Sequence, residues 1–290
     1  MPTALDTQHI EFTKALDAAP RTVFDQLIDE QHLRAWLAEH AQVEPRLEGA
    51  YRFWGRHTPL MPAASDAAQR ITHLELGRTL GFSWPWGGTD SDVRIELHAT
   101  PRGADLRLRH TLVQGTVAGF SRTESRLFVQ DHWDVALANL RSYLRVGAPA
   151  IRPDYTRGPG DVARVSIEID APIDRVWRAL TDPREMDKWL STTAAADIRP
   201  GGAYSYGWAF DGTPCGPTRI LEADPPRRLV HDWVYQAESP TRTEWTLEPL
   251  SPTRTRVTIE QIGIRTARDH TGYTGGWAKF ASALKELMEA

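Results

Sequence analysis

The chain repeats itself, and this repeat constrains the fold more than any other feature of the sequence. Gly49-Ala50-Tyr51 recurs 153 residues later as Gly202-Ala203-Tyr204. Further residues match in the same order, at offsets that shrink to 144: Val23-Phe24 with Val176-Trp177, Trp36-Leu37 with Trp189-Leu190, Leu80 with Leu229, His110 with Gln261, and Trp133 with Trp277. Each change of offset is small enough to be an insertion or deletion in a loop. A repeat unit of 144 to 153 residues has the length of a domain and is much longer than a solenoid repeat. The sequence therefore predicts one fold, duplicated in tandem.

A segment rich in proline and glycine, from Gly147 to Gly160, separates the copies. Such composition is typical of a semi-extended linker. We predict domain 1 over residues 1–148, a linker over 149–162 and domain 2 over 163–290, with the boundary near residue 155. Two domains agree with the length of 290 residues.

The order of elements is clearest in the second copy. Alternating apolar residues predict a first strand over 165–169, and Thr181-Asp182-Pro183 has the cap and proline of a helix start. Two short helices, strands that turn at 224–226 and at 250–253, and a long last helix with one apolar stripe follow. The predicted fold is α+β: in each copy a curved antiparallel sheet wraps around a long C-terminal helix, with two short helices after the first strand.

Composition excludes several classes of protein. One cysteine, Cys215, rules out an internal disulfide and a cysteine-built metal site. The net charge of -4 gives no sign of a nucleic-acid surface, and no apolar run is long enough to cross a membrane. The start of the chain has no secretory signal pattern. We expect a cytoplasmic protein with no metal, cofactor, nucleic-acid partner or membrane contact; its arginine bias is typical of GC-rich bacteria.

The second copy contains a further set of motifs: residues 176–183, Lys188-Trp189-Leu190, Pro200 to Tyr204, Asp224 to Leu229 and Gly276-Trp277. Through these motifs it resembles the family named for homologues of the heat-shock chaperone ATPase activator. The first copy keeps three of these motifs but lacks the Asp-Pro-Pro turn. The resemblance implies the helix-grip fold of the START and pollen-allergen-like (SRPBCC) superfamily, whose members hold a small hydrophobic molecule between the sheet and the last helix.

The alternation of strand residues assigns side chains to the face that would line such a cavity. Most of the expected ligand contacts are aromatic: Trp36, Tyr51, Phe53, Phe82 and Trp84 in the first copy, and Trp189, Tyr204, Tyr206, Trp208, Trp233, Trp245 and Trp277 in the second. His110, His231 and Gln261 are polar residues on these apolar walls. Each is either a ligand contact or a core residue with its own hydrogen-bond partner.

Other motifs carry weaker signals. Asp131-His132-Trp133 could form an Asp–His pair, but an aspartate at a helix start is usually a cap. Cys215 lies in a predicted loop without a histidine nearby in sequence, so we expect an unreactive thiol. The histidines show no metal-ligand spacing, and no glycine-rich phosphate loop follows a strand.

Three functions remain open. The first is binding of a small hydrophobic or aromatic molecule by a carrier, a sensor or a sequestering self-resistance protein. The second is a polyketide cyclase or dehydratase, for which His110 and His231 are the candidate catalytic residues. The third is a co-chaperone. Fold resemblance alone does not choose among them, and the oligomeric state is not indicated.

Overall fold

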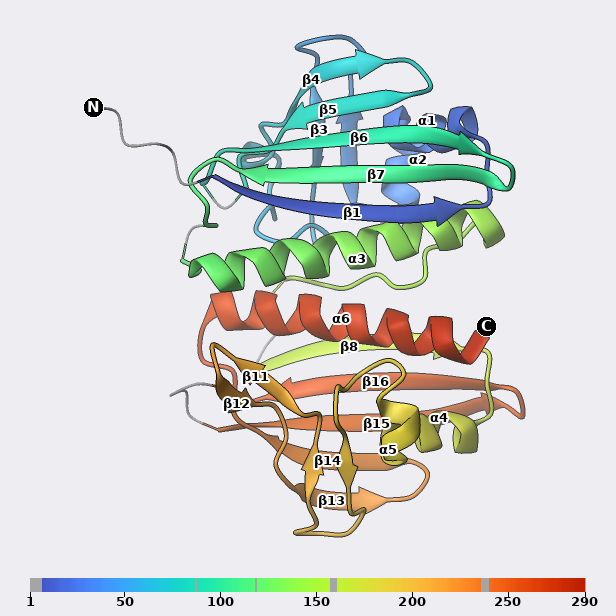
Figure 1. Ribbon diagram of the computed structural model, residues 1–290, viewed down its shortest axis with the longest axis vertical. Coiled ribbons are helices and arrows are strands. Elements are labelled where there is room, and N and C mark those ends of the chain that lie inside the picture. The colour runs from blue at the N-terminus through green and yellow to red at the C-terminus, as the bar shows by residue number, and fades with distance from the viewer. Residues whose placement is uncertain (1–6, 87, 118, 157–160, 236–239, 290) are drawn as a thin grey trace. The chain divides into compact units, whose positions relative to one another are not determined.

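The computed structural model describes residues 7–86, 88–117, 119–156, 161–235 and 240–289. The chain divides into two compact units, Met1–Thr156 and Arg157–Ala290, and each has its own sheet and its own long helix (Figure 1). Residues 149–156 of the predicted linker belong to the first unit, while residues 157–160 lie outside the described residues.

The first unit contains a five-stranded antiparallel sheet in the order β1-β7-β6-β5-β4 and a separate β2-β3 hairpin. Its elements are β1 (Gln8–Leu16), α1 (Pro20–Ile28), α2 (Glu30–Trp36), β2 (His40–Val43), β3 (Tyr51–Trp54), η1 (Ala64–Asp66), β4 (Arg70–Glu75), β5 (Thr79–Ser83), β6 (Ser91–Thr100), β7 (Gly103–Leu112) and α3 (Arg122–Val146). The long helix α3 runs along the sheet and packs against β1 (Figure 1).

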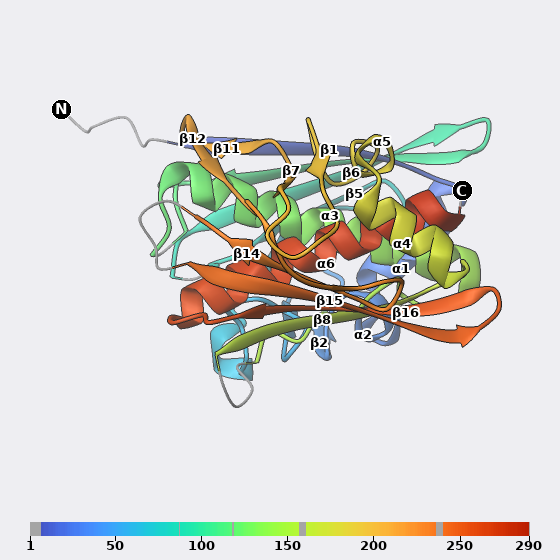
Figure 2. The same ribbon diagram turned by 90° about the horizontal axis from the view of Figure 1, so that it is seen from below.

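The second unit repeats this plan, with the sheet order β13-β14-β15-β16-β8. Its elements are β8 (Val162–Ile169), α4 (Ile173–Thr181), α5 (Pro183–Met186), β9 (Ala195–Ala196), β10 (Tyr204–Ser205), β11 (Trp208–Phe210), β12 (Thr213–Cys215), β13 (Ile220–Asp224), β14 (Arg228–Trp233), β15 (Thr241–Ser251), β16 (Arg254–Ile262) and α6 (Ala267–Glu289). Helix α6 packs against β8 and β16, as Figure 2 shows from a second side. The predicted fold class, two tandem helix-grip domains, is confirmed.

Strand β16 illustrates how the sequence sets the two faces of a sheet. Val257, Ile259 and Gln261 are fully buried, and they alternate with the partly exposed Thr258 and Glu260. Successive side chains of a strand point to opposite faces, so a period of two separates the helix side from the solvent side. Gln261 therefore lies under α6 among apolar neighbours.

The repeated Gly-Ala-Tyr motif has the same physical cause in both copies. A Cβ atom on Gly49 would collide with the carbonyl oxygen of Glu44, and one on Gly202 with that of Asp197. Only glycine permits this close approach of two backbone segments. Two residues later, the hydroxyl of Tyr51 donates to the carbonyl of Leu27 at 2.7 Å, and that of Tyr204 donates to Leu180 at 2.8 Å.

The long helices extend well beyond the residues that the apolar stripe predicts. Helix α3 begins at Arg122 because Ser121 and Glu124 form a capping box, and it ends at Gly147, which has a φ of 74°. Asp131 therefore lies inside the helix, and the interpretation of Asp131 as a helix-start cap is wrong. The Ser-x-x-Glu pattern at 121–124 was the local signal for the true start.

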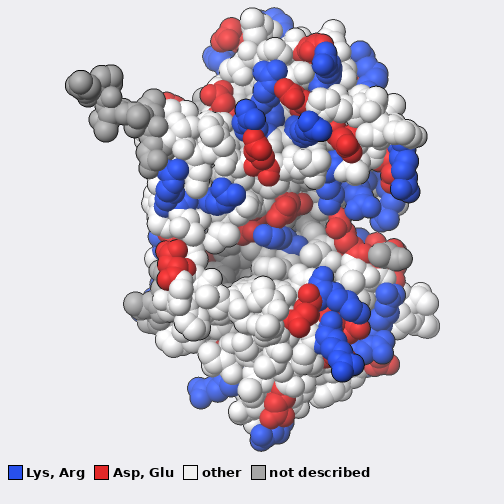
Figure 3. Space-filling model, viewed as in Figure 1, with Lys and Arg blue, Asp and Glu red and all other residues white. Residues whose placement is uncertain are grey.

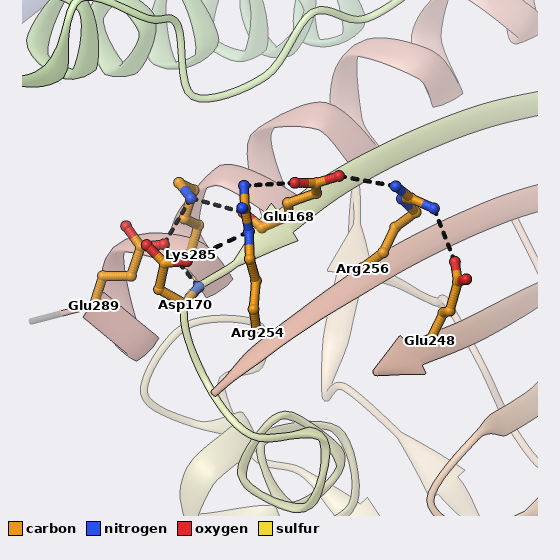
Figure 4. Close-up of polar contacts among 7 residues, drawn as sticks. All are labelled: Glu168, Asp170, Glu248, Arg254, Arg256, Lys285 and Glu289. Atoms are coloured by element: carbon orange, nitrogen blue, oxygen red, sulfur yellow. Dashed lines mark hydrogen bonds and ion pairs between the residues drawn. The ribbon is translucent and has the colours of Figure 1, made fainter. Parts of the chain in front are cut away.

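Charged side chains fasten the end of α6 to its sheet (Figure 4). The Lys285 ammonium donates to the Glu168 carbonyl oxygen at 2.7 Å and to the Glu289 carboxylate at 2.6 Å. Arg254 and Arg256 both pair with the Glu168 carboxylate, at 2.6 and 2.9 Å. The Arg256 hydrogen bond is the largest cause that lowers the pKa of Glu168. These two pairs join β16 to β8 within the sheet, and because both arginines are about half exposed, they add little to stability.

Elsewhere on the surface, charges of both signs are mixed. On the face drawn in Figure 3, lysine and arginine side chains lie among aspartate and glutamate side chains. Arg109 pairs with Glu11 at 2.9 Å, and Arg94 pairs with Glu96 at 2.8 Å. No helix among the described residues combines the length and apolar character that crossing a membrane requires.

Candidate functional site

The predicted aromatic wall of the first domain forms one packed group. Trp36, Tyr51, Phe53, Phe82 and Trp84 are all buried, with at most 2% of each side chain exposed. The ring centroids of Tyr51 and Phe82 lie 4.7 Å apart, and those of Phe53 and Trp84 lie 5.0 Å apart. Trp86, which the sequence analysis did not single out, stacks on Trp84 at 4.4 Å.

His110 lies in the middle of this group with both ring nitrogens bonded. The Trp133 indole N–H donates to Nδ1 at 2.9 Å, and Nε2 lies 2.9 Å from the Ser91 hydroxyl. An indole can only donate, so Nδ1 must accept and Nε2 must carry the proton. Burial, with a smaller contribution from His132, lowers the pKa of His110 to about 3. The ring is therefore neutral at pH 7 and held in one tautomer.

The predicted wall of the second domain is also assembled, although its edge is more open. Tyr204, Tyr206 and Trp245 are fully buried, and Trp277 and Trp233 are nearly so. Trp189 and Trp208 are half-buried. Trp208 comes from the β11–β12 hairpin, and its ring stacks on Phe280 of α6 with centroids 5.0 Å apart. This stacked pair lies at the border between the aromatic interior and the surface.

His231 has a different bonding pattern but the same protonation state. Its Nδ1 donates to the carbonyl of Asp232 at 2.8 Å, and Nε2 accepts from the Tyr206 hydroxyl and the Trp245 indole, each at 3.2 Å. Burial lowers the pKa of His231 to about 4. A proton on Nε2 would also displace two donors, so the neutral ring fits its surroundings.

Gln261 binds the long helix of the second domain. Its Oε1 accepts from the Trp277 indole at 3.1 Å and from the Thr243 hydroxyl at 2.7 Å, while Nε2 donates to Thr241 at 2.6 Å. His110 receives the indole of Trp133 in the corresponding place of the first domain. The two copies thus hold the helix tryptophan with different polar residues at the same position of the sheet.

Several buried polar atoms have no hydrogen-bond partner among the described residues. In the second domain these are the indole nitrogen of Trp233 and the hydroxyl oxygen of Thr274 on α6. In the first domain they include Nε2 of His132, the hydroxyl oxygen of Thr58 and Oε1 of Gln69. Buried polar groups are almost always paired, so such atoms indicate places where a bound molecule or water would complete the structure.

Thr274, Thr58 and Gln69 were not among the site residues predicted from the sequence. Thr274 lies on the buried stripe of α6, three residues before Trp277, and a polar residue on that stripe was a usable signal. Thr58 and Gln69 lie outside the regular helices and strands, where no periodicity marks a face.

A small cavity of about 10 Å³ in the first domain adjoins His132. Its lining includes Trp36 of α2, His57, Asn139 of α3 and the linker residue Tyr155. The linker is fixed here, because His57 Nδ1 bonds the Pro153 carbonyl at 2.8 Å and Asn139 accepts from the Ile151 N–H at 3.0 Å. Burial lowers the pKa of His132 to about 3, so this histidine too is neutral at pH 7. A space of this size is near the minimum that can hold one water molecule.

Within the described ranges, no group of three or more His, Cys, Asp or Glu side chains is placed to hold a metal ion. The thiol of Cys215, at the end of β12, is half-buried, and burial raises its pKa. A raised thiol pKa reduces the thiolate fraction, in agreement with the expected low reactivity.

Comparison with known protein families gives two matched segments, one in each unit of the chain. Residues 17–145 and 170–289 match the family described as Activator of Hsp90 ATPase homolog 1-like protein. A search of curated proteins gives no match.

Several solved structures are similar. The crystal structure of DynU16, a protein of the dynemicin biosynthetic locus, is 16% identical over 97% of this chain and 98% of that one, with a TM-score of 0.41. CalU16 from Micromonospora echinospora is 27% identical over 43% of this chain and 73% of its own, with a TM-score of 0.37. MLL2253 from Mesorhizobium loti is 26% identical over 43% of this chain and 96% of its own, also with a TM-score of 0.37.

The two matched segments span well over half of the residues, and each contains the short helices, four of the five strands of the main sheet and nearly all of the long helix of one unit. The chain thus belongs to the Activator of Hsp90 ATPase homolog 1-like family and contains two tandem copies of its SRPBCC helix-grip fold, an architecture of the ligand-binding type.

Proposed function

We propose that the chain binds a small hydrophobic or aromatic molecule in its helix-grip interior. The observation that carries the proposal is the pair of unpartnered polar atoms in the second domain, the Trp233 indole nitrogen and the Thr274 hydroxyl. Both are buried in an aromatic interior, with Trp277 packed against Trp233 at 5.2 Å. Ligand sites are mostly apolar and contain a few placed polar groups, which is the character of this interior.

The half-buried aromatic pair gives a ligand a route to these atoms. Trp208 and Phe280 stack on each other, and the edge of Trp208 also meets Trp233 at 5.9 Å. Displacing the Trp208 ring would bring a planar molecule against Trp233 with little loss of apolar contact, because one aromatic surface replaces another. The remaining wall residues, including Trp189, Tyr206 and Trp245, are proposed contacts further inside.

For His110 and His231, a role in a binding site is a better proposal than a role in catalysis. A cyclase using His110 or His231 would require a ring nitrogen that can exchange a proton with the substrate. In both histidines each ring nitrogen already has a protein partner, and both pKa values lie far below neutrality. We therefore propose that these two histidines shape the walls of the binding interior.

Thr274→Val provides a sharp test, because it should stabilise the free protein and weaken its complex. Removing a buried hydroxyl without a partner should raise the free energy of unfolding by about 1 kcal/mol, since the desolvation penalty disappears. A ligand that bonds the hydroxyl should lose roughly tenfold in affinity. Calorimetric titration with 1,8-dihydroxyanthraquinone and thermal melts on the same samples measure both effects.

Thr271→Val is the matched control on the same helix. The Thr271 hydroxyl already donates to the carbonyl of Ala267 at 3.0 Å, so its loss should lower stability slightly and leave the affinity unchanged. Equal affinity of the Thr274→Val variant and the unmodified chain would remove Thr274 from the site. Failure of the unmodified chain to bind any of a panel of planar aromatic compounds would refute the proposed function.

A further inference from the structure

The sulfur atom of Met61 receives two N–H donors inside the first domain. The Trp84 indole nitrogen lies 3.0 Å from the sulfur, and the Gln69 amide nitrogen lies 3.3 Å from it. All three side chains are at most 1% exposed. A thioether is a weak acceptor, so two strong donors share a poor partner.

Unsatisfied acceptors accompany these donors. Within the part of the chain that the structure describes, Oε1 of Gln69 and the Thr58 hydroxyl oxygen are buried without a partner, and both residues are at least 98% buried. The Gln69 amide nitrogen also donates to the Phe53 carbonyl at 3.3 Å, which determines which end of the amide is nitrogen. Gln69 thus offers one donor to the sulfur and leaves its acceptor oxygen unused.

Met61 enters the interior on a short closed loop. The Gly55 N–H donates to the Met61 carbonyl at 2.9 Å, and the Thr58 N–H donates to the Gly55 carbonyl at 3.0 Å. Leu60, directly before Met61, has a φ of 61°, in the left-handed region that a branched side chain rarely adopts. Strain of this kind is typical of ligand clamps and switches.

We propose that Met61 occupies a polar subsite of the first domain, and that an uncharged aromatic molecule with a carbonyl beside an N–H or O–H group, as in a lactam, replaces its side chain. The inference rests on the proposed function and specifies the ligand chemistry of the first domain. The ligand carbonyl takes the N–H donors of Trp84 and Gln69, and the neighbouring N–H or O–H donates to Gln69 Oε1. A primary amide pairs with such an edge through two parallel hydrogen bonds.

The surroundings favour a flat ring in this position. Phe53 meets Trp84 edge to face at 5.0 Å, and Trp84 stacks on Trp86 at 4.4 Å. The methionine side chain is unbranched and flexible, so a change of rotamer can move it out of the subsite. Because Met61 fills the subsite in the free protein, the apparent affinity is the intrinsic affinity multiplied by the fraction of molecules in which the subsite is open.

The test compares 2-quinolinone with N-methyl-2-quinolinone, which lacks the N–H, in calorimetric titrations of the full chain. Met61→Ala should bind 2-quinolinone at least tenfold more tightly than the unmodified chain and at least tenfold more tightly than it binds the N-methyl compound. Adding Gln69→Leu to Met61→Ala should abolish this preference. Met186→Ala is the matched control, because Met186 is also fully buried but belongs to the second domain; it should bind each compound as the unmodified chain does.

A second measurement works even if Met61→Ala does not fold. In nitrogen-15 spectra of the unmodified chain, the indole N–H signal of Trp84, assigned from its loss in Trp84→Phe, should move when 2-quinolinone is added and not when the N-methyl compound is added. A Met61→Ala chain that binds both compounds equally, or an indole signal that does not move, overturns the subsite. Binding of 1,8-dihydroxyanthraquinone that persists in that case leaves the proposed function intact, whereas loss of all aromatic binding contradicts the function itself.

Discussion

Lowering the pH from 7 to 5 is expected to destabilise both domains strongly, because three buried histidines are neutral in the folded chain. The pKa values of His110 and His132 fall to about 3, and that of His231 to about 4, mainly through burial. An unfolded histidine has a pKa of about 6.5, so it is the unfolded chain that takes up protons in this range. Each histidine stabilises the fold fully above pH 6.5, and this contribution is lost as the pH falls toward its folded value.

The expected size follows from linkage. Between pH 7 and 5, each of these histidines should remove about 2 kcal/mol from the free energy of unfolding, which gives about 4 kcal/mol in the first domain and about 2 kcal/mol in the second. The half-buried His57, whose pKa burial also lowers, acts in the same direction in the first domain. Urea unfolding at a series of pH values, followed by tryptophan fluorescence and circular dichroism, measures the slope.

His132→Leu isolates one of these contributions. The variant should be at least as stable as the unmodified chain at pH 7, because Nε2 of His132 has no partner among the described residues, and its first domain should lose about 2 kcal/mol less on going to pH 5. His9→Gln, which changes an exposed histidine, serves as the control for the loss of one histidine from the chain. Identical slopes for His132→Leu and the unmodified chain would contradict the assignment of His132 as a buried neutral group.

Gln261→Leu is expected to destabilise the second domain by roughly 2–5 kcal/mol, since it leaves two buried donors without an acceptor. Those donors are the Trp277 indole and the Thr243 hydroxyl. The Thr241 hydroxyl loses the N–H that it accepts. Thermal and urea unfolding of the full chain, with ligand titration of the same samples, measure stability and affinity separately.

A double-mutant cycle with Trp277→Phe measures how much of the loss of stability in Gln261→Leu comes from the hydrogen bond between Gln261 and the Trp277 indole. Once the indole N–H is removed, Gln261→Leu should cost about 1 kcal/mol less, because one orphaned donor is gone. Gln8→Leu is the matched control, since Oε1 of this buried glutamine has no partner in the described part of the chain and its loss should change stability little. If Gln261→Leu instead spared stability and abolished binding, Gln261 would be a ligand contact and not a helix anchor.

Local patterns along the chain were enough to predict the duplication, the order of the main elements and the buried faces of the strands that carry His110, His231 and Gln261. These properties depend on local spacing: a period of two places Gln261 beside Val257 and Ile259 on the buried face of β16. The recurrence of Gly49 and Gly202 likewise reflects a backbone approach that only glycine permits in either copy. The aromatic residues of both interiors could be named in advance for this reason.

The hydrogen-bond partners of the buried polar groups depend on tertiary packing and could not be predicted from local patterns. His110 meets Trp133 and Ser91, and Tyr206 meets His231, across 19 to 25 residues of chain, and His57 meets Pro153 across 96. No periodicity encodes such meetings, because they depend on how strands, helix and loops come together in space. The same packing left Thr274, His132 and Gln69 with unpaired atoms. A pattern of residues can place a polar side chain inside a domain, but only the packed fold determines whether its hydrogen bonds are completed by the protein or left for a ligand.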